Sequence, residues 1–352
     1  MMNKEERLEY SKKALEEVYA MKGKRVLITG GAGFVGAHLV EHILKSTDWN
    51  VVIIDRLNNA SSGFNRLRDI PAWGSPRINV LATDLSMEIP EGVAQEIGEV
   101  DYIFHLAAES HVQKSIEEPY RFLKSNVEGT FWMLEFARKQ KNLEKFFYFS
   151  TDEVFGNAPL GVEYKEDDRL NPRNPYACFK ASGELMMKAW GNTYGIPYII
   201  TNSMNIFGER QHPEKFVPLC IKKILENEKI GIHIDPKTKK PGSRFWVHAR
   251  NTSALLLFLI AKGEIGQRYN IVPDTELDNL EIPQLIAKIM NKPLKYKLVD
   301  YHSTRPGHDP RYALDGTKVK EMGWEFPVGF EDSFRKTIEW SLKKENFKWT
   351  NI

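Results

Sequence analysis

A tyrosine and a lysine four residues apart, Tyr176 and Lys180, form the first pair in this sequence that could do chemistry. Residues 177–190 follow a helical pattern, so this spacing places both side chains on one face of a helix. An ammonium group beside a phenol stabilises the phenolate, which lets the tyrosine remove a proton from an alcohol near neutral pH. Such pairs also occur by chance on surface helices. The pair therefore indicates an active site only together with the rest of the chain.

A second group of reactive side chains follows the apolar run of residues 146–149, which predicts a buried strand. Ser150, Thr151, Asp152 and Glu153 come directly after it and are expected at the end of that strand. A hydroxyl at Thr151 could hold an alcohol substrate, and two neighbouring carboxyl groups could carry a second proton transfer. Together with the tyrosine and the lysine, these residues predict a proton-transfer site.

A glycine-rich turn near the N-terminus predicts a dinucleotide site. Gly30, Gly33 and Gly36 lie between a short apolar strand and a helix that begins at Phe34 and Val35. The first glycine permits a tight turn, the second lets the backbone approach a pyrophosphate, and the third allows the helix to pack closely on the sheet. The pyrophosphate would then lie on the free amides at the helix N-terminus.

The ends of the following strands supply further candidates for cofactor contact. Residues 51–54 predict a strand that ends in Asp55, whose carboxylate would accept from both hydroxyls of an adenosine ribose and repel a 2′-phosphate. This favours NAD over NADP, although Arg56 follows directly. The remaining candidates at strand ends are Asp84, Leu85, Ala107, Ala108 and Ser150.

Strands and helical patterns alternate over this part of the chain, which is typical of a parallel, doubly wound sheet with ligands at the carboxyl ends of its strands. We therefore predict an α/β fold with a Rossmann-type domain over residues 21–200. A thin apolar stripe predicts a largely solvated helical extension within residues 1–20. A smaller mixed α/β substrate-binding lobe, interleaved with the Rossmann domain, is expected over residues 201–352.

Composition excludes several classes of function. The chain has 352 residues, and its 49 basic and 47 acidic residues give a net charge of +2, which indicates neither a nucleic-acid nor a membrane-surface partner. Two cysteines, Cys178 and Cys220, argue against a disulfide scaffold and a zinc site and for a reducing compartment. There is no apolar run long enough for a membrane span and no apolar signal-peptide core in the first twenty residues. We expect a cytoplasmic globular protein without a metal.

The side chains suited to a phosphorylated ligand come mostly after residue 195. Asn205 and Lys215 belong to a segment crowded with amide and cationic groups, as a lid over such a ligand would need. Arg244 and Arg305 add guanidinium groups, which suit a diphosphate. His111 could contact a substrate phosphate or cap a helix, and both interpretations remain open.

These motifs resemble the extended short-chain dehydrogenase/reductase family and, within it, the nucleotide-sugar 4,6-dehydratases, those acting on dTDP-glucose in particular. The similarity covers most of the chain from about residue 24 to residue 342. Its most specific part is Ser-Thr-Asp-Glu-Val-Phe-Gly at residues 150–156, because related epimerases and decarboxylases usually lack the Asp-Glu pair. Further matches are Ala-Ala-Glu-Ser-His-Val (107–112), His-Pro-Glu-Lys-Phe-Val-Pro (212–218) and Arg-Pro-Gly-His-Asp (305–309).

The resemblance implies dehydration of a hexose that is linked to a nucleoside diphosphate, with tightly bound NAD. Tyr176, its pKa lowered by Lys180, would remove the proton of a 4-hydroxyl held by Thr151 as hydride leaves carbon 4 for NAD. Glu153 would then take the proton of carbon 5 while Asp152 protonates the departing 6-hydroxyl, before the hydride returns to carbon 6. By the same resemblance the diphosphate would be gripped by Asn205, Lys215, Arg244, Asn270 and Arg305. A homodimer through the apolar-faced helices at residues 119–138 and 177–190 is also implied.

Departures from the family pattern fall on the substrate side. Phe179 precedes the lysine where relatives commonly carry serine, and Gln113 and Lys114 replace the usual Asp-Arg. A UDP- or CDP-linked sugar, or an amino sugar, is therefore open as the substrate. Two other functions are also weighed: a sugar-nucleotide 4-epimerase or decarboxylase, and a catalytically silent NAD-binding protein. The Asp-Glu pair speaks against the first of these, and the intact tyrosine and lysine speak against the second.

Overall fold

A seven-stranded parallel sheet forms the centre of the protein, with strand order β10-β6-β5-β4-β1-β2-β3. The computed structural model describes residues 2–58, 62–235, 238–300 and 309–349. The strands are β1 (Arg25–Thr29), β2 (Asn50–Asp55), β3 (Ile78–Ala82), β4 (Tyr102–His105), β5 (Lys145–Thr151), β6 (Tyr198–Ser203) and β10 (Arg268–Ile271). This sheet confirms the predicted α/β fold of the Rossmann type.

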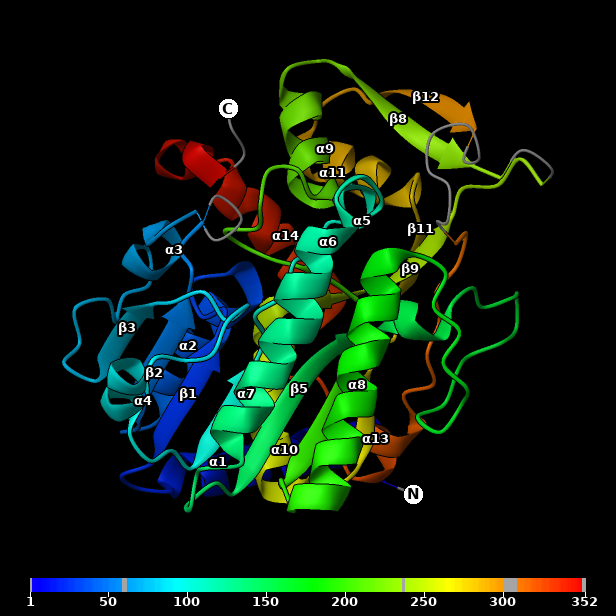
Figure 1. Ribbon diagram of the computed structural model, residues 1–352. Coiled ribbons are helices and arrows are strands. Elements are labelled where there is room, and N and C mark those ends of the chain that lie inside the picture. Colours follow the sequence, from blue (N-terminus) through cyan, green and yellow to red (C-terminus); the bar gives the residue numbers. More distant parts are fainter. Residues whose placement is uncertain (1, 59–61, 236–237, 301–308, 350–352) are drawn as a thin grey trace.

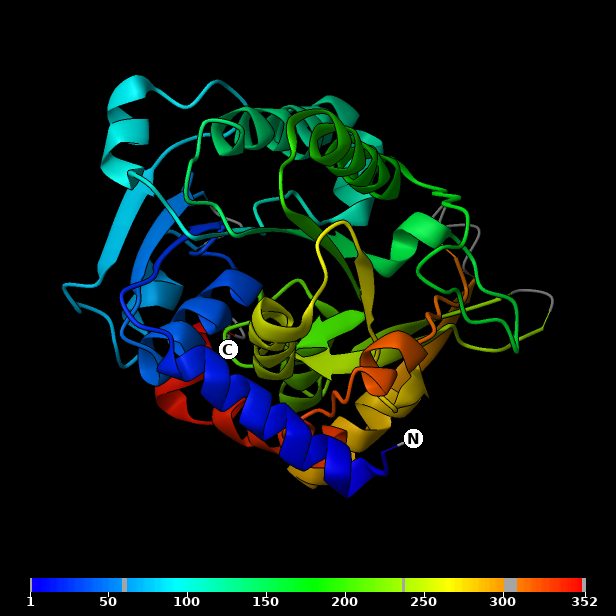
Figure 2. The same cartoon turned by 90° about the horizontal axis from the view of Figure 1, so that it is seen from below.

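Helices cover both faces of the sheet, as the views in Figures 1 and 2 show. One face carries α1 (Lys4–Ala20), α2 (Phe34–Ser46) and α10 (Ala249–Lys262). The other carries α4 (Glu91–Ile97), α6 (Pro119–Leu123), α7 (Gly129–Ala137) and α8 (Pro175–Tyr194). Successive strand residues point to opposite faces, so Leu27 and Ile28 of β1 enter different clusters, one on each side of the sheet.

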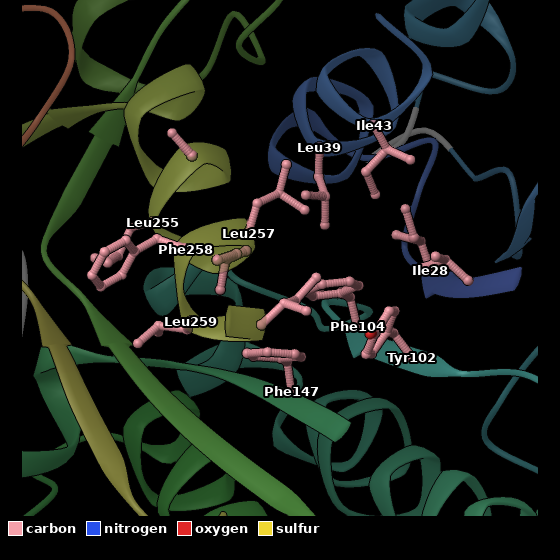
Figure 3. Packing of buried hydrophobic residues seen from close by; sticks show 14 of the residues in the cluster. Ile28, Leu39, Ile43, Tyr102, Phe104, Phe147, Leu255, Leu257, Phe258 and Leu259 are labelled. Carbon is pink, nitrogen blue, oxygen red and sulfur yellow. The ribbon is translucent and has the colours of Figure 1, made fainter. Parts of the chain in front are cut away.

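The cluster under α2 and α10 combines aromatic and aliphatic side chains of the strands with side chains of the two helices (Figure 3). Phe104 of β4 stacks on Phe147 of β5 with ring centroids 4.6 Å apart. Leu257 and Leu259 of α10 and Leu39 of α2 belong to the same buried cluster (Figure 3). The helix α10 thus covers strands that lie far from it in the sequence.

The N-terminal helix α1 contacts the body more extensively than its sparse apolar stripe predicts. Ala14, Leu15 and Val18 are buried, and α1 packs against α10. Polar contacts add to this, because Ser11 donates to the Gly323 carbonyl at 3.0 Å. The sequence pattern of α1 does not indicate the contact with Gly323, because that residue lies far away in the sequence.

The helix predicted over residues 119–138 is interrupted. Between α6 and α7 the chain forms a π-helical turn, η1 (Lys124–Glu128). The turn places Asn126 so that its side chain accepts from the Glu109 amide at 2.8 Å and donates to the Glu109 carbonyl at 3.0 Å. π-Helical turns occur frequently at functional sites, and this one fixes the backbone of Glu109 in the segment that follows β4.

A C-terminal lobe sits beyond the carboxyl ends of the central strands (Figure 1). Its small sheets combine β7 (Asn205–Phe207), β9 (Ser243–His248) and β11 (Glu276–Asp278), and separately β8 (Lys229–Ile234) and β12 (Lys295–Asp300). Its helices are α9 (Phe216–Leu225), α11 (Glu281–Met290) and α14 (Phe330–Ser341). The short elements of the chain are α3 (Asn65–Arg68), α5 (Val112–Glu117), η2 (Asp152–Phe155), α13 (Thr317–Glu321) and η3 (Lys344–Trp349).

The described residues include no helix that is both long enough and apolar enough to cross a bilayer. They hold no group of three or more His, Cys, Asp or Glu side chains that is placed to bind a metal ion. Cys178 and Cys220 are both free thiols.

Candidate active site

The carboxyl ends of the central strands and the C-terminal lobe enclose a cavity of about 620 Å³. Every residue proposed from the sequence for catalysis or for cofactor contact lines it. So do three of the proposed substrate residues, His111, Asn205 and Lys215. Segments that are far apart in the sequence therefore meet around one space.

The glycine-rich turn between β1 and α2 forms one wall of the cavity. Gly30 has a φ of +71°, and a Cβ there would lie 2.8 Å from the Ala107 nitrogen, so only glycine fits. At Gly36 a Cβ would lie 2.2 Å from the Gly30 carbonyl oxygen. Gly33 caps α2 without a side chain, which leaves the first helix amides facing the cavity for an anion.

Asp55 stands at the end of β2 and is held by this turn. Its carboxylate accepts from the amides of Ala32 at 3.1 Å and Leu57 at 2.8 Å. The next residue, Arg56, pairs with the buried Glu109, which also accepts from Arg121 at 2.8 Å. The guanidinium that raised the question of NADP is therefore engaged by a carboxylate.

The carboxyl pair follows from the way in which β5 ends. Thr151 is the last residue of the strand and caps η2, accepting from the Glu153 amide at 3.4 Å. Its hydroxyl donates to Asp152 at 2.9 Å. Gly156 ends η2 with a φ of +78°, where a Cβ would lie 2.5 Å from the Asn171 carbonyl oxygen. This short turn directs both acidic side chains into the cavity wall.

The two carboxyl groups have different surroundings. Burial first, and the neighbouring Glu153 second, raise the pKa of Asp152 to about 7. One Asp152 oxygen, Oδ2, is buried without a hydrogen-bond partner among the described residues. Burial also raises the pKa of Glu153, but Asn174 donates to its carboxylate at 2.9 Å and Tyr312 at 3.3 Å. These donors favour an ionised Glu153 beside a protonated Asp152.

Tyr176 and Lys180 begin helix α8, which starts at the cap Asn174. The Thr151 side chain lies near the Tyr176 hydroxyl. Burial lowers the pKa of Lys180 to about 7, and its ammonium lies 4.3 Å from the Tyr148 ring centroid. Burial, with Glu153 second, raises the pKa of Tyr176, and the Thr151 side chain lowers the pKa of that phenol in part. The lowering of the tyrosine pKa that we expected from Lys180 is therefore outweighed in this arrangement.

A buried ion pair beneath this site was not predicted. Glu184, one helical turn beyond Lys180, accepts from Ser150 at 2.5 Å and from Asn202 at 2.7 Å. Its other oxygen pairs with Arg268 at 2.5 Å. The continued spacing of four residues from the tyrosine through the lysine to Glu184 was the available signal in the sequence.

Two of the proposed substrate residues, Arg244 and Asn270, do not line the cavity. Arg244 donates to the backbone carbonyls of Asp309 and Pro310, both at 2.8 Å, and its guanidinium lies 4.4 Å from the Tyr312 ring centroid. Asn270 is fully buried, and its amide group donates to the carbonyls of Tyr164 and Asp315, both at 3.1 Å. Arg305 lies outside the described residues.

The sequence left two roles open for His111, and the structure shows it in one of them, as a helix cap. It caps α5, accepting from the Lys114 amide at 3.3 Å. Its imidazole also lines the cavity, 3.8 Å from Glu214. Capping and a position beside the ligand space are therefore compatible.

Comparison with known proteins now places this architecture in a family. The family model for GDP-mannose 4,6-dehydratase matches residues 27–337. The chain belongs to that family. This membership confirms the resemblance to nucleotide-sugar 4,6-dehydratases within the extended short-chain dehydrogenase/reductases. Among relatives of this dehydratase-family chain, the dTDP-glucose 4,6-dehydratase of Salmonella typhimurium is 37% identical to it, over 93% of this chain and 94% of its own.

Solved structures agree with this membership. DesIV, a dTDP-glucose 4,6-dehydratase from Streptomyces venezuelae with NAD bound, has a TM-score of 0.82 and 33% identity, and the match covers 92% of this chain and 98% of DesIV. The UDP-glucose 4-epimerase of Thermus thermophilus in complex with NAD has a TM-score of 0.79 and 25% identity, and the match covers 90% of this chain and 98% of the epimerase. Dehydratases and epimerases thus share this family fold, and the side chains of the site must distinguish them.

Proposed function

We propose that the protein is an NAD-dependent nucleotide-sugar 4,6-dehydratase. It converts a hexose linked to a nucleoside diphosphate into the 4-keto-6-deoxy sugar with loss of water. The observation that carries this proposal is the pair of adjacent buried carboxyl groups, Asp152 and Glu153, in contrasting surroundings. Epimerisation and decarboxylation need no acid to expel a hydroxyl group, so they give such a pair no task.

The cavity wall suits NAD. The free amides at the N-terminus of α2 bind a diphosphate, and the Asp55 carboxylate suits ribose hydroxyls. Because Arg56 is engaged by Glu109, the carboxylate dominates this end of the cavity and disfavours a 2′-phosphate. When bound, NAD supplies the acceptor for the hydride of carbon 4 and the donor that returns it to carbon 6.

In the first step Tyr176 removes the proton of the sugar 4-hydroxyl. Thr151, which lies near Tyr176 and donates to Asp152, holds that hydroxyl in place. Burial disfavours the charge on Tyr176 and on Lys180 separately, yet a phenolate beside an ammonium offsets both penalties. The tyrosine and the lysine therefore work as one proton-holding unit.

In the second step Glu153 and Asp152 eliminate water. The 4-ketone acidifies the C5–H bond, and Glu153 accepts that proton as the electron pair forms a double bond between carbons 5 and 6. The C6–O bond breaks, and the proton of Asp152 completes the departing water. A pKa of about 7 for Asp152 keeps that proton available near neutral pH.

The substrate is proposed to be a nucleoside-diphosphate hexose such as dTDP-glucose. Lys215, His111 and Asn205 line the side of the cavity formed with the C-terminal lobe, where an ammonium, an imidazole and an amide group suit a diphosphate. Asn270, whose amide group serves the packing of the chain, is not assigned to the ligand. Arg244 acts through the segment around Tyr312, the residue that donates to Glu153.

We further propose a homodimer through α6, α7 and α8 and a cytoplasmic location. Tyr120 on α6 is 66% exposed, and Leu185 and Tyr194 on α8 are 61% and 50% exposed, which places large apolar side chains on the outer surface of these helices. The free thiols Cys178 and Cys220 suit a reducing compartment.

The test is to incubate the purified protein, without added NAD, with dTDP-glucose and separately with UDP-glucose, CDP-glucose and UDP-glucuronic acid. Mass spectrometry then follows the loss of one water from each sugar nucleotide. Loss of water without net formation of NADH supports the dehydratase and names the donor. Formation of a stereoisomer, or loss of carbon dioxide from a uronic acid donor, would instead assign the epimerase or decarboxylase. Binding of NAD without any turnover would assign the silent protein.

A further inference from the structure

The C-terminal segment η3 docks onto the loop that follows Asp55. Trp349, near the end of the described chain, is only 4% exposed, and its indole donates to Asp69 at 2.7 Å. Lys348 donates to the other oxygen of the same carboxylate at 2.6 Å. One side chain directly after α3 thus holds two residues of the tail.

The contact reaches the cavity wall through Arg66. This arginine of α3 is fully buried and lines the cavity beside Asp55. Its guanidinium lies 5.3 Å from the Trp349 ring centroid, within the range of a cation–π contact. Its Nε donates to the Arg210 carbonyl at 2.8 Å. The indole therefore supports the outer side of a residue whose other side belongs to the ligand space.

Arg210 extends these contacts to α2. It adopts a φ of +64°, unusual for a residue other than glycine, and its guanidinium pairs with Glu41 of α2 at 2.5 Å. The tail, the loop after β2 and the helix behind the glycine-rich turn are thus joined. Because Asp55 suits the adenosine ribose and the α2 amides suit the adjoining pyrophosphate, these contacts enclose the adenosine half of a dinucleotide.

We propose that the tail segment Lys344–Trp349 is a latch that retains the adenosine half of the bound dinucleotide. Asp69 and Trp349 are its positioning residues, and Arg66 is the wall that they hold. The proposal rests on the proposed function, because it takes NAD to be the ligand. Release of the adenosine half requires the wall to move, and the tail contacts oppose that movement. A cofactor that is regenerated in every turnover gains from being retained in this way.

The experiment compares the full-length protein with Trp349→Ala and Asp69→Asn. NAD that copurifies with each protein is quantified before and after gel filtration, and Kd is measured by calorimetry on protein stripped of nucleotide. We expect the Kd of Trp349→Ala for NAD to rise about tenfold, with a smaller rise for Asp69→Asn. Lys344→Ala is the matched control, since Lys344 is exposed in the same segment.

Fragments of NAD distinguish a latch from general loosening of the protein. The Kd for ADP-ribose should rise by the same factor as the Kd for NAD, and the Kd for nicotinamide mononucleotide should stay unchanged. Equal weakening of both fragments, or unchanged NAD retention in both variants, would overturn the latch. If Trp349→Ala does not fold, Asp69→Asn alone decides between these outcomes. Failure of the unaltered protein to bind NAD would instead overturn the proposed function.

Discussion

Asn174 donates to Glu153 at 2.9 Å from the position that caps helix α8. Its side-chain oxygen accepts from the Ala177 amide, also at 2.9 Å, and its side-chain nitrogen serves the carboxylate. One residue therefore both starts the helix that carries Tyr176 and stabilises the charge on Glu153. The proposed base of the first step and that of the second step are positioned by the same amide.

The two roles of Asn174 can be separated by substitution. Asn174→Ser retains a capping oxygen but loses the donor to Glu153, so we expect stability close to that of the original protein and a higher pKa for Glu153. The acidic limb of the pH profile for water loss should shift to higher pH. Asn174→Ala should show the same shift and also lose about 1 kcal/mol of stability to unfolding. An identical pH profile in both variants and in the original protein would remove Asn174 from the mechanism.

Substitutions of Glu153 and of Tyr176 should separate the two steps of the reaction. Glu153→Gln should still transfer hydride from carbon 4, seen as NADH absorbance in a single turnover, but lose water at least about a hundredfold more slowly. Tyr176→Phe should prevent both steps, since no base is left for the 4-hydroxyl. Normal turnover by Glu153→Gln, or NADH formation by Tyr176→Phe, would contradict the assigned roles.

The raised pKa of Asp152 also predicts how stability depends on pH. Its pKa is about 7 in the folded protein, well above the ordinary value of 3.8 for an aspartate, so the folded state binds this proton more tightly. The contribution of Asp152 to stability is therefore complete below about pH 4 and is lost as the pH rises toward 7. Asp152→Asn has no such loss, so its stability relative to the original protein should be about 4 kcal/mol more favourable at pH 8 than at pH 4. Denaturant unfolding at the two pH values measures this, and an equal difference at both would refute the shift.

The proposed dimer gives a prediction about mass in solution. Leu185→Arg places a charge on the exposed face of α8 and should produce monomers in light scattering after gel filtration. Leu160→Arg is the control, because Leu160 is 91% exposed and does not belong to α6, α7 or α8. A dimer that survives the change at Leu185, or a monomeric original protein, would rule out this interface.

Much of the site follows from local patterns in the sequence. Glycine spacing, strand ends and the spacing of Tyr176 and Lys180 all concern residues close in the sequence, and a parallel sheet gathers its strand ends at one edge. The direction in which a side chain points does not follow from such local patterns. Arg244 and Asn270 belong to suggestive segments, yet their polar groups bond to backbone carbonyls that reach them through tertiary folding. Tyr312, which donates to Glu153 across 159 positions of sequence, has no local signal at all.

Two parts of the fold escaped prediction for related reasons. Strand β10 is only four residues long and includes Arg268 and Asn270, so its pattern does not alternate like that of an exposed strand and is not a continuous apolar run. Arg268 pairs with Glu184, and the Asn270 amide group donates to backbone carbonyls of distant segments. The π-helical turn at Asn126 likewise depends on the Glu109 backbone, which no helical periodicity encodes.

The position of α10 has a consequence for the order in which the chain can fold. This helix, residues 249–262, covers strands that are complete by residue 151, and α1 packs on α10 in turn. During synthesis the first strands emerge long before α10 does. Until α10 is made, one apolar face of the partly formed sheet therefore stays exposed to water and to other chains. The N-terminal helix α1 completes its contacts later still, because its partner Gly323 follows α10 in the sequence. Folding of this protein is therefore completed late, because it depends on long-range contacts made by segments that follow the first strands in the sequence.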